Sequence, residues 1–393
     1  MKIAISGAGV AGPTLAYWLL QAGHTPTLIE ASSRLRTGGY MIDFWGVGYT
    51  VAERMGIMPQ VCAAGYDLEE VRYVDAHGRN AGGISAATIR RELGERFTSL
   101  PRGDLAETIY RTIEGRVETI FGTSITSIDE HPGGVWIVLN GKLAREYDLV
   151  VGADGLHSNV RALAFGPEAE FERPLGYYVA AFEAEGYAPR DELTYVSYGD
   201  PGRQISRFAM RENRTMFLFV FAADQLGGAE PKGLEERRQT LQHTFASMEW
   251  EWPRIAQALA NANDIYFDRV SQISLKSWSK GRVTLLGDAA ACVSLLAGEG
   301  TGLAMTEAYV LAGELAADAD YSRALERYES RLRPFIAGKQ ASARNFARSF
   351  TPRTAMGVWL RNQAVKLMAV PGLPDLFVGA QMRDAFALPD YGL

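Results

Sequence analysis

The pattern of apolar and polar residues divides the start of the chain into a strand, a helix and a second strand. Residues 2–6 and 24–30 are short apolar runs, and residues 13–22 carry apolar side chains at helical spacing. The second run ends on an acid, Glu30. This order predicts a βαβ unit at the N-terminus.

Apolar runs further along predict two kinds of sheet. Residues 149–153 and 283–287 are typical of buried strands, whereas 177–223 are β in character and 216–223 alternate with a period of two. Residues 71–84 predict a hairpin of a different sheet from that of the first strands. Four runs between 117 and 147 predict a small antiparallel set.

Helical spacing dominates the C-terminal half. We expect helices over 234–260, 303–317, 321–349 and 353–369. In the last of these, several residues fall near one face, a spacing that suits packing on another surface. They are Met356, Trp359, Leu360, Gln363 and Leu367.

Composition and charge exclude several classes of protein. The net charge of −6 over 393 residues argues against a nucleic-acid or anionic-membrane partner. No apolar run is long enough for a membrane span, and the histidines show no metal-ligand spacing. Cys62 and Cys292 are far apart in apolar surroundings, so we expect buried free thiols and a cytoplasmic location.

The turn after the first strand carries a glycine pattern, GAGVAG, with Gly7, Gly9 and Gly12. In a dinucleotide-binding unit the first glycine permits the tight turn and the third lets the helix pack on the strand. The second lets a pyrophosphate approach the backbone at the positive end of the helix. Glu30 lies near the spacing of about 20 residues expected for an acid on the ribose. The segment therefore predicts dinucleotide binding.

Two later strand ends carry related chemistry. In residues 151–161, VGADGLHSNVR, Asp154 follows a strand and precedes a helix. In residues 281–302, GRVTLLGDAAACVSLLAGEGTG, Asp288 ends a strand, and Gly300–Gly302 can present N–H groups to an electron-rich ring edge. By themselves, the two segments are also compatible with a capped strand end and with a tight turn that needs small residues.

Together and in this order, the three segments resemble the class A flavoprotein monooxygenases, the p-hydroxybenzoate hydroxylase-like family. The resemblance covers nearly the whole chain. It implies an α/β fold in which a Rossmann-like FAD-binding domain is interleaved with a mixed β-sheet substrate domain, followed by a C-terminal helix. The predicted ranges are 1–70, 101–172 and 271–350 for the FAD-binding domain, 71–100 and 173–270 for the substrate domain, and 351–393 for the helix and tail.

The resemblance also implies which residues bind FAD without a covalent bond. They are Gly7, Gly9, Ala11, Gly12, Glu30, Arg36, Asp43, Arg102, Ile125, Asp154, Asp288, Gly300, Thr301 and Gly302. Glu30 would bind the adenosine ribose, Asp288 the ribitol side, and Arg102 would lie near the flavin. A solvated loop charge is the alternative for Arg36, which, like Asp43, matches a position used around the cofactor by tetracycline-inactivating members. A helix-end ion pair is the alternative for Arg102.

The family implies a monooxygenase in which NADPH or NADH reduces FAD and O₂ adds to give a C4a-hydroperoxyflavin. That species hydroxylates an aromatic or polyketide-type small molecule, with tetracycline inactivation as one form of the activity. A reductase or dehydrogenase without oxygen insertion and a non-catalytic FAD- or ligand-binding protein are the alternatives. The residues predict no catalytic base, no metal and no particular oligomer.

Substrate contacts are predicted only by location in the β domain. The candidates are Tyr178, Arg203, Phe217 and Phe219, for which core or surface roles are the alternative. The helix at 353–369 has two possible functions, docking on the FAD-binding domain for stability or closure of the substrate pocket at the domain junction. Closure would favour a bulky, multi-ring substrate.

Overall fold

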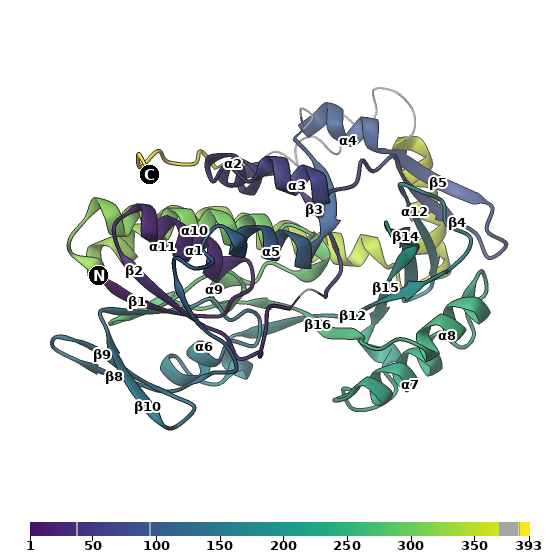
Figure 1. The fold of residues 1–393 in the computed structure, drawn as a ribbon. Coiled ribbons are helices and arrows are strands. Elements are labelled where there is room, and N and C mark those ends of the chain that lie inside the picture. The colour runs from purple at the N-terminus through teal and green to yellow at the C-terminus, as the bar shows by residue number, and fades with distance from the viewer. Residues whose placement is uncertain (37, 94–95, 369–383, 385) are drawn as a thin grey trace.

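The computed structural model describes residues 1–36, 38–93, 96–368, 384 and 386–393. Two halves, each built on its own sheet, make up the molecule (Figure 1). Long strands join them, β12 (Glu172–Glu185) and β16 (Tyr266–Ile273). Because these strands run from one half into the other, the halves form one continuous structure.

The first half is built on a six-stranded sheet in the order β17-β18-β11-β1-β2-β7. Its strands are β1 (Lys2–Ser6), β2 (Thr25–Ile29), β7 (Glu118–Ile120), β11 (Leu149–Gly152), β17 (Ser279–Lys280) and β18 (Val283–Leu285). All neighbours pair in parallel except β17 with β18. Parallel strands are buried on both faces, which is why β11 and β18 read as continuous apolar runs.

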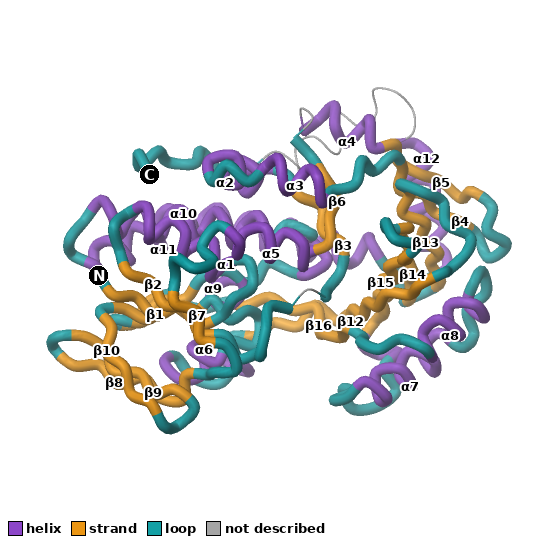
Figure 2. Tube along the Cα trace, viewed as in Figure 1, coloured by secondary structure: helices purple, strands orange, loops and turns teal. Residues whose placement is uncertain are grey.

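Helices cover this sheet on one side, and a small sheet lies on the other (Figure 2). The helices of the first half are α1 (Ala11–Gln21), α2 (Gly46–Arg54), α3 (Met58–Ala64), α5 (Arg102–Arg111), α6 (Asn159–Ala164), α9 (Asp288–Ala291), α10 (Gly300–Ala317) and α11 (Tyr321–Phe350), with short 3₁₀ turns at η1 (Glu168–Glu170) and η3 (Leu295–Ala297). α1, α5, α10 and α11 lie on the helical side (Figure 1).

The small sheet corrects one prediction. It contains β8 (Ile125–His131), β9 (Gly134–Leu139) and β10 (Leu143–Tyr147) in antiparallel order. The first of the four runs predicted for this set, β7, instead pairs in parallel with β2. α5 precedes β7 and supplies the long crossover that a parallel pair requires, which a three-residue run cannot reveal by its own pattern.

The second half is a seven-stranded sheet in the order β16-β12-β15-β14-β13-β4-β5. Its further strands are β4 (Glu70–Val74), β5 (Asn80–Ser85), β13 (Thr194–Asp200), β14 (Arg203–Ala209) and β15 (Arg214–Ala222). The hairpin predicted in residues 71–84 is confirmed as β4–β5. A separate two-stranded sheet, β3 (Met41–Phe44) with β6 (Thr98–Pro101), lies between the halves, next to α4 (Ala86–Leu93).

The two faces of the seven-stranded sheet have different neighbours. α7 (Leu234–Phe245) and α8 (Trp252–Ala260) cover one face, and η2 (Ala223–Gln225) leads toward them. The helix predicted over 234–260 is therefore two helices, because Trp250 between them takes a φ of 54°. The opposite face packs toward the first half, because Val220 belongs to an apolar cluster against which Leu295 and Leu296 of η3 also pack.

The C-terminal segment touches both halves. α12 (Ala355–Met368) packs on β5 and β13, and residues 386–393 pack on the first half beside α2 and α10 (Figure 1). Tyr391 Oη donates to the Glu314 carboxylate at 2.7 Å, and the Phe386 ring stacks on Phe335. Residues 369–383, within the predicted tail, lie outside the described residues.

The packing face predicted for the last helix is wrong. Met356, Trp359, Leu360 and Leu367 are 54–66% exposed, whereas Val365 is buried. The inner face is partly polar, because the Arg361 guanidinium donates to Gln204 Oε1 at 2.7 Å and lies over the Tyr73 ring. Apolar spacing therefore pointed to the side of the helix that faces away from the sheet.

Among the described helices, none combines the length and the apolar composition that a membrane span requires.

Candidate functional site

The three predicted segments meet at the carboxyl ends of β1, β11 and β18, which are neighbouring parallel strands. This edge of an open parallel sheet is where such folds bind their ligands. Local sequence placed each segment at a strand end, and the strand order places them side by side.

The glycine loop has two glycines that the fold requires and one that it leaves open. A Cβ on Gly7, whose φ is 106°, would lie 2.5 Å from the Ala153 carbonyl oxygen. A Cβ on Gly12 would lie 2.0 Å from the Gly7 carbonyl oxygen. At Gly9 the nearest atom is a terminal nitrogen of the Arg102 guanidinium, at 3.5 Å. The space above Gly9 is therefore open and faces a cation.

Glu30 holds the same loop from the end of β2. Its buried carboxylate accepts hydrogen bonds from the backbone N–H groups of Ala8 and Ser32, both at 2.8 Å. Each carboxylate oxygen keeps a second lone pair for another donor, such as a hydroxyl. Arg36 lies 3.7 Å from this carboxylate but is 76% exposed, so the attraction is weak.

Arg102 begins α5, where its backbone N–H donates to the Tyr40 carbonyl oxygen at 3.1 Å. In the part of the chain that the structure describes, no carboxylate lies within ion-pair distance of its guanidinium. The helix-end ion pair is therefore not formed among these residues. Burial raises the pKa of the Asp288 carboxyl, and the Arg102 charge partly offsets that effect.

Asp154 joins the ends of two strands. Its carboxylate accepts from the Ser6 hydroxyl at 3.2 Å, from the Ser158 hydroxyl, and from the Val160 N–H at 3.1 Å. These bonds cap α6 and tie it to β1. Asp154 is thus fully engaged within the protein, which is the capped strand end considered from the sequence.

Arg161 links the second segment to the third. Its fully buried guanidinium donates to the Ala289 carbonyl oxygen at 3.1 Å and to the Glu168 carboxylate at 2.8 Å. His157, from the same segment, contacts Glu168 at 2.9 Å and Asp268 of β16 at 3.1 Å. The hydrogen bond to Asp268 is the main cause that raises the pKa of His157 to about 9. His157 therefore bridges the two halves, a role that sequence reasoning missed.

Glu307 was also missed, and it positions the Gly287–Asp288 turn. Gly287 has a φ of 63°, and its N–H donates to the buried Glu307 carboxyl at 2.7 Å. Burial raises the pKa of Glu307 to about 8, so the group is mainly neutral at pH 7. The available signal was an acid within the otherwise apolar run of α10. Asp288 Oδ1 lies 3.7 Å from where a Cβ on Gly300 would be, so the acid adjoins the start of α10.

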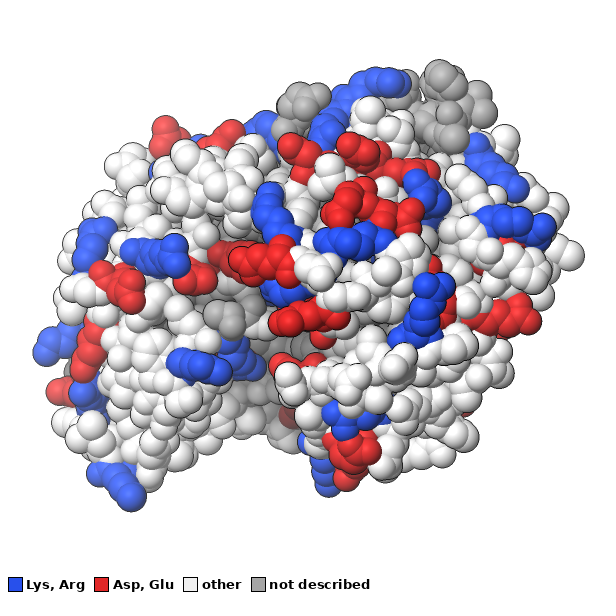
Figure 3. Space-filling view, turned by 45° about the vertical axis from the view of Figure 1, so that its right-hand side comes forward, with Lys and Arg blue, Asp and Glu red and all other residues white. Residues whose placement is uncertain are grey.

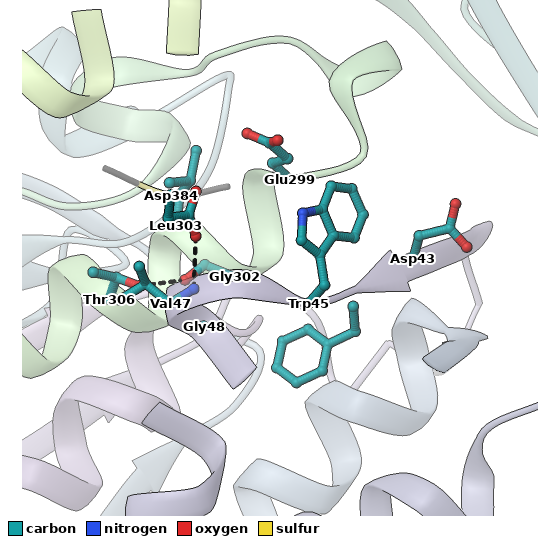
Figure 4. Close-up of a pocket in the computed structure, with 10 residues that line it drawn as sticks. Asp43, Trp45, Val47, Gly48, Glu299, Gly302, Leu303, Thr306 and Asp384 are labelled. Carbon is teal, nitrogen blue, oxygen red and sulfur yellow. Dashed lines mark hydrogen bonds between the residues drawn. The ribbon is translucent and has the colours of Figure 1, made fainter. Parts of the chain in front are cut away.

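A small cavity of about 20 Å³ lies between β3, α2 and α10 (Figure 4). Asp43 and Gly302, both predicted, line it together with Trp45 and Glu299. The Ser99 hydroxyl donates to Asp43. Gly48 and Gly302 bring α2 and α10 into close contact, because a Cβ on Gly48 would lie 2.3 Å from the Gly302 Cα.

Asp384, in the C-terminal tail, closes this cavity from one side (Figure 4). Its carboxylate accepts from the Val47 N–H at 2.7 Å and pairs with Lys339 at 2.7 Å. Lys339 also pairs with Glu299 at 2.9 Å. The sequence offered no signal for this contact, because Val47 and Asp384 are distant in the chain.

The remaining cofactor candidates are placed as follows. Ala11 is buried at the start of α1, and Thr301 is partly exposed in the first turn of α10. Ile125 is buried at the start of β8, and its carbonyl oxygen accepts from the Asn159 side chain at 2.7 Å. The structure thus brings Ala11 and Thr301 to the strand-end region, whereas Ile125 is buried in the small sheet.

The predicted substrate contacts lie on the sheet face that α7 and α8 cover, which is the face directed away from the first half. Phe217, Phe219 and Tyr178 pack in the apolar cluster under α7 and α8. Arg203 is on the same side, because its guanidinium donates to the Thr244 carbonyl oxygen of α7 at 2.8 Å. Two-residue alternation separates the faces of a strand but does not identify the one nearer the cofactor. The face toward the first half instead carries Leu218 and Tyr266.

The cysteine prediction is confirmed in part. Both thiols are free, and Cys292 is buried, but Cys62 is exposed on the last turns of α3. Within the described ranges, no group of three or more metal-ligating side chains is close enough to hold an ion.

Comparison with known proteins identifies the family. Residues 1–341 match the family described as FAD binding domain. The chain belongs to this family. The segment after residue 341, which includes α12, lies beyond the match.

Individual relatives and solved structures are consistent with this family. A flavin-dependent monooxygenase from Legionella longbeachae serogroup 1 (strain NSW150) is 34% identical over 358 residues, 86% of this chain and 87% of that protein. One from an unknown prokaryotic organism is 34% identical over 348 residues, with the same coverage. The crystal structure of the tetracycline destructase Tet(51) is 31% identical with a TM-score of 0.82, covering 99% of both chains. The predicted family, mixed α/β fold and cofactor are confirmed: this chain is an FAD-dependent monooxygenase of the class A type.

Proposed function

We propose that this enzyme hydroxylates an aromatic or polyketide-type small molecule, with tetracyclines as the first candidates, and that NADPH or NADH is the reductant. The observation that carries the proposal is the open space above Gly9, which faces the Arg102 guanidinium at the carboxyl ends of the parallel strands. The similarity to Tet(51) over nearly the full length of both chains supports the substrate class.

Four groups of this chain fit FAD. The open approach at Gly9 and the N-terminus of α1 suit the pyrophosphate, and Arg102 neutralises part of its charge. The free lone pairs of Glu30 suit a ribose hydroxyl, and Asp288 suits the ribitol hydroxyls. The N–H groups at Gly300–Gly302 suit the electron-rich edge of the flavin ring. Arg36 and Ile125 are the least supported members of the predicted set, because Arg36 is solvent-exposed and Ile125 is buried at the start of β8.

When bound and reduced, FAD supplies the activation of O₂, and one oxygen atom enters the substrate while the other leaves as water. The residues of this chain hold the reactants and exclude water. The substrate lies against the sheet face that carries Leu218 and Tyr266, because this face is directed toward the first half. Domain boundaries at the predicted residues and a cytoplasmic location belong to the same proposal.

Product analysis tests this function. Purified enzyme with FAD and NADPH is incubated with tetracycline and, separately, with simple phenols, each with and without catalase. The molecular masses of the products are measured by mass spectrometry. We expect substrate-stimulated NADPH consumption and a product heavier by one oxygen atom. The Asp288→Ala variant is assayed alongside the wild-type enzyme. Its control is Asp224→Ala, which changes an exposed acid far from the strand ends.

The alternatives give different results. A product that gains only hydrogen would identify a reductase. FAD binding without any stimulated NADPH consumption across the set would favour a ligand-binding protein. Stimulated consumption that yields only H₂O₂ would refute oxygen insertion into the compounds used.

A further inference from the structure

A second cavity, of about 400 Å³, lies where the start of β12, the end of β16 and α11 meet. Its volume is within the range of small-molecule sites, about 300–1,000 Å³. None of the residues predicted to bind FAD or substrate lines it. The cavity therefore shares no residue with the predicted sets, although its Leu175 belongs to the same apolar cluster as Leu218 and Tyr266.

Two arginines, Arg173 of β12 and Arg344 of α11, line this cavity and give it its charge. Arg344 of α11 donates to Gln272 Oε1 at 3.1 Å, and Arg173 of β12 donates to the carbonyl oxygens of Glu170 and Glu172 at 3.0 and 2.8 Å. All three acceptors are neutral. Among the described residues, no carboxylate forms an ion pair with either guanidinium. The Glu172 carboxylate, the nearest in sequence, is engaged by Arg269 and Ser271.

Amide side chains hold the cavity wall in place. The buried Gln272 donates to the carbonyl oxygens of Val293 and Gln340, at 2.7 and 2.8 Å. Gln340 in turn donates to the carbonyl oxygens of Ile273 and Cys292, at 2.8 and 2.9 Å. β16, α11 and the segment after Asp288 are thereby pinned together. Arg344 is consequently presented on a fixed support.

We infer that this cavity binds the phosphate group of a small molecule. Two guanidinium forks with no acidic partner in the described chain match a dianion that accepts several charge-assisted hydrogen bonds. The protein is acidic overall, with a net charge of −6, so attraction of an anion here depends on these two cations and not on the net charge. Pro174 and Leu175 add an apolar wall, and the volume exceeds that of phosphate alone, so the phosphate belongs to a larger molecule.

Two sources of this phosphate are distinguishable, the 2′-phosphate of NADPH and a separate phosphorylated metabolite. The FAD-loaded enzyme is titrated with inorganic phosphate, with NADPH and with NADH, and binding is followed by calorimetry in the absence of substrate. Arg344→Gln and Arg173→Gln are compared with Arg116→Gln, which changes an exposed arginine that likewise donates to a carbonyl oxygen, that of Thr112. Flavin absorbance and unfolding temperature show that each variant is folded.

We expect each cavity variant to weaken phosphate binding about tenfold, the loss of one charge-assisted interaction, and Arg116→Gln to leave it unchanged. If NADPH binding weakens in parallel while NADH binding does not, the phosphate is that of the reductant. If only phosphate binding weakens, the site serves another phosphorylated molecule. Absence of phosphate binding at millimolar concentration, or equal binding by folded cavity variants and wild type, would overturn the inference. Because no turnover is measured, this result is independent of the proposed hydroxylation.

Discussion

The glycine loop allows cofactor binding and folding to be separated by two equivalent substitutions, Gly9→Ala and Gly12→Ala. At Gly9 the added methyl has 3.5 Å to the nearest atom, and its backbone φ is not in the left-handed region. The apoprotein should therefore tolerate alanine and gain about 0.4–1 kcal/mol from the lower entropy of the unfolded chain. At Gly12 the methyl would lie 2.0 Å from the Gly7 carbonyl oxygen, which is backbone and cannot rotate away.

The two substitutions should change different free energies, that of FAD binding for Gly9→Ala and that of unfolding for Gly12→Ala. The methyl on Gly9 keeps the pyrophosphate from the backbone, and losing one charge-assisted hydrogen bond costs about 1.5–3 kcal/mol. That weakens FAD binding by about 10- to 150-fold. Overpacking at Gly12 should lower the free energy of unfolding of the apoprotein by about 1–3 kcal/mol or prevent folding.

Two measurements on the same preparations check this contrast. Flavin fluorescence quenching gives the Kd of FAD, and urea unfolding of the apoprotein gives its stability. We expect Gly9→Ala to lose affinity at full stability and Gly12→Ala to lose stability first. Wild-type FAD affinity in Gly9→Ala would refute the placement of the pyrophosphate. Wild-type stability in Gly12→Ala would refute the packing argument.

Three further predictions concern other parts of the molecule. Asp288→Ala should weaken FAD binding by about 1–3 kcal/mol in the same fluorescence assay, and an unchanged Kd would remove Asp288 from the site. His157 has a folded-state pKa of about 9, above its ordinary value of 6.5. Its bonds to Glu168 and Asp268 therefore stabilise the fold fully below about pH 6.5, and this contribution is lost as the pH rises through about 9. The ring is 59% exposed, so the effect should stay below about 1 kcal/mol, and a His157→Gln variant with the same pH profile of unfolding as wild type would contradict it. The double variant Trp359→Ser and Leu360→Gln should have a free energy of unfolding within about 0.5 kcal/mol of wild type, because both side chains are 54% exposed. Loss of FAD or precipitation of this variant would show that the face is covered.

Charge on the surface gives no further guide to the substrate. Acidic and basic side chains are interspersed on the face shown in Figure 3, whose centre is hollowed. The charge pattern on this face therefore does not indicate the substrate, which the product screen addresses directly.

Local sequence determined the cofactor-binding elements. The strand, glycine turn and helix at residues 2–22 are specified by contacts between near neighbours, such as that between Gly7 and Gly12. The same holds for Asp154, whose partner Ser158 is four residues away, and for the β4–β5 hairpin. Each depends on local spacing, which a single chain displays directly.

Only the tertiary structure decided which way each face of an element is directed. Alternation in β15 separates Phe217 and Phe219 from Leu218, yet the side that faces the first half depends on where α7 and α8 pack. The inner face of α12 likewise depends on Arg361 meeting Gln204 and Tyr73, residues more than 150 positions away. Periodicity is a property of the element itself, whereas the direction of a face is set by its packing partners, and these come from distant parts of the chain.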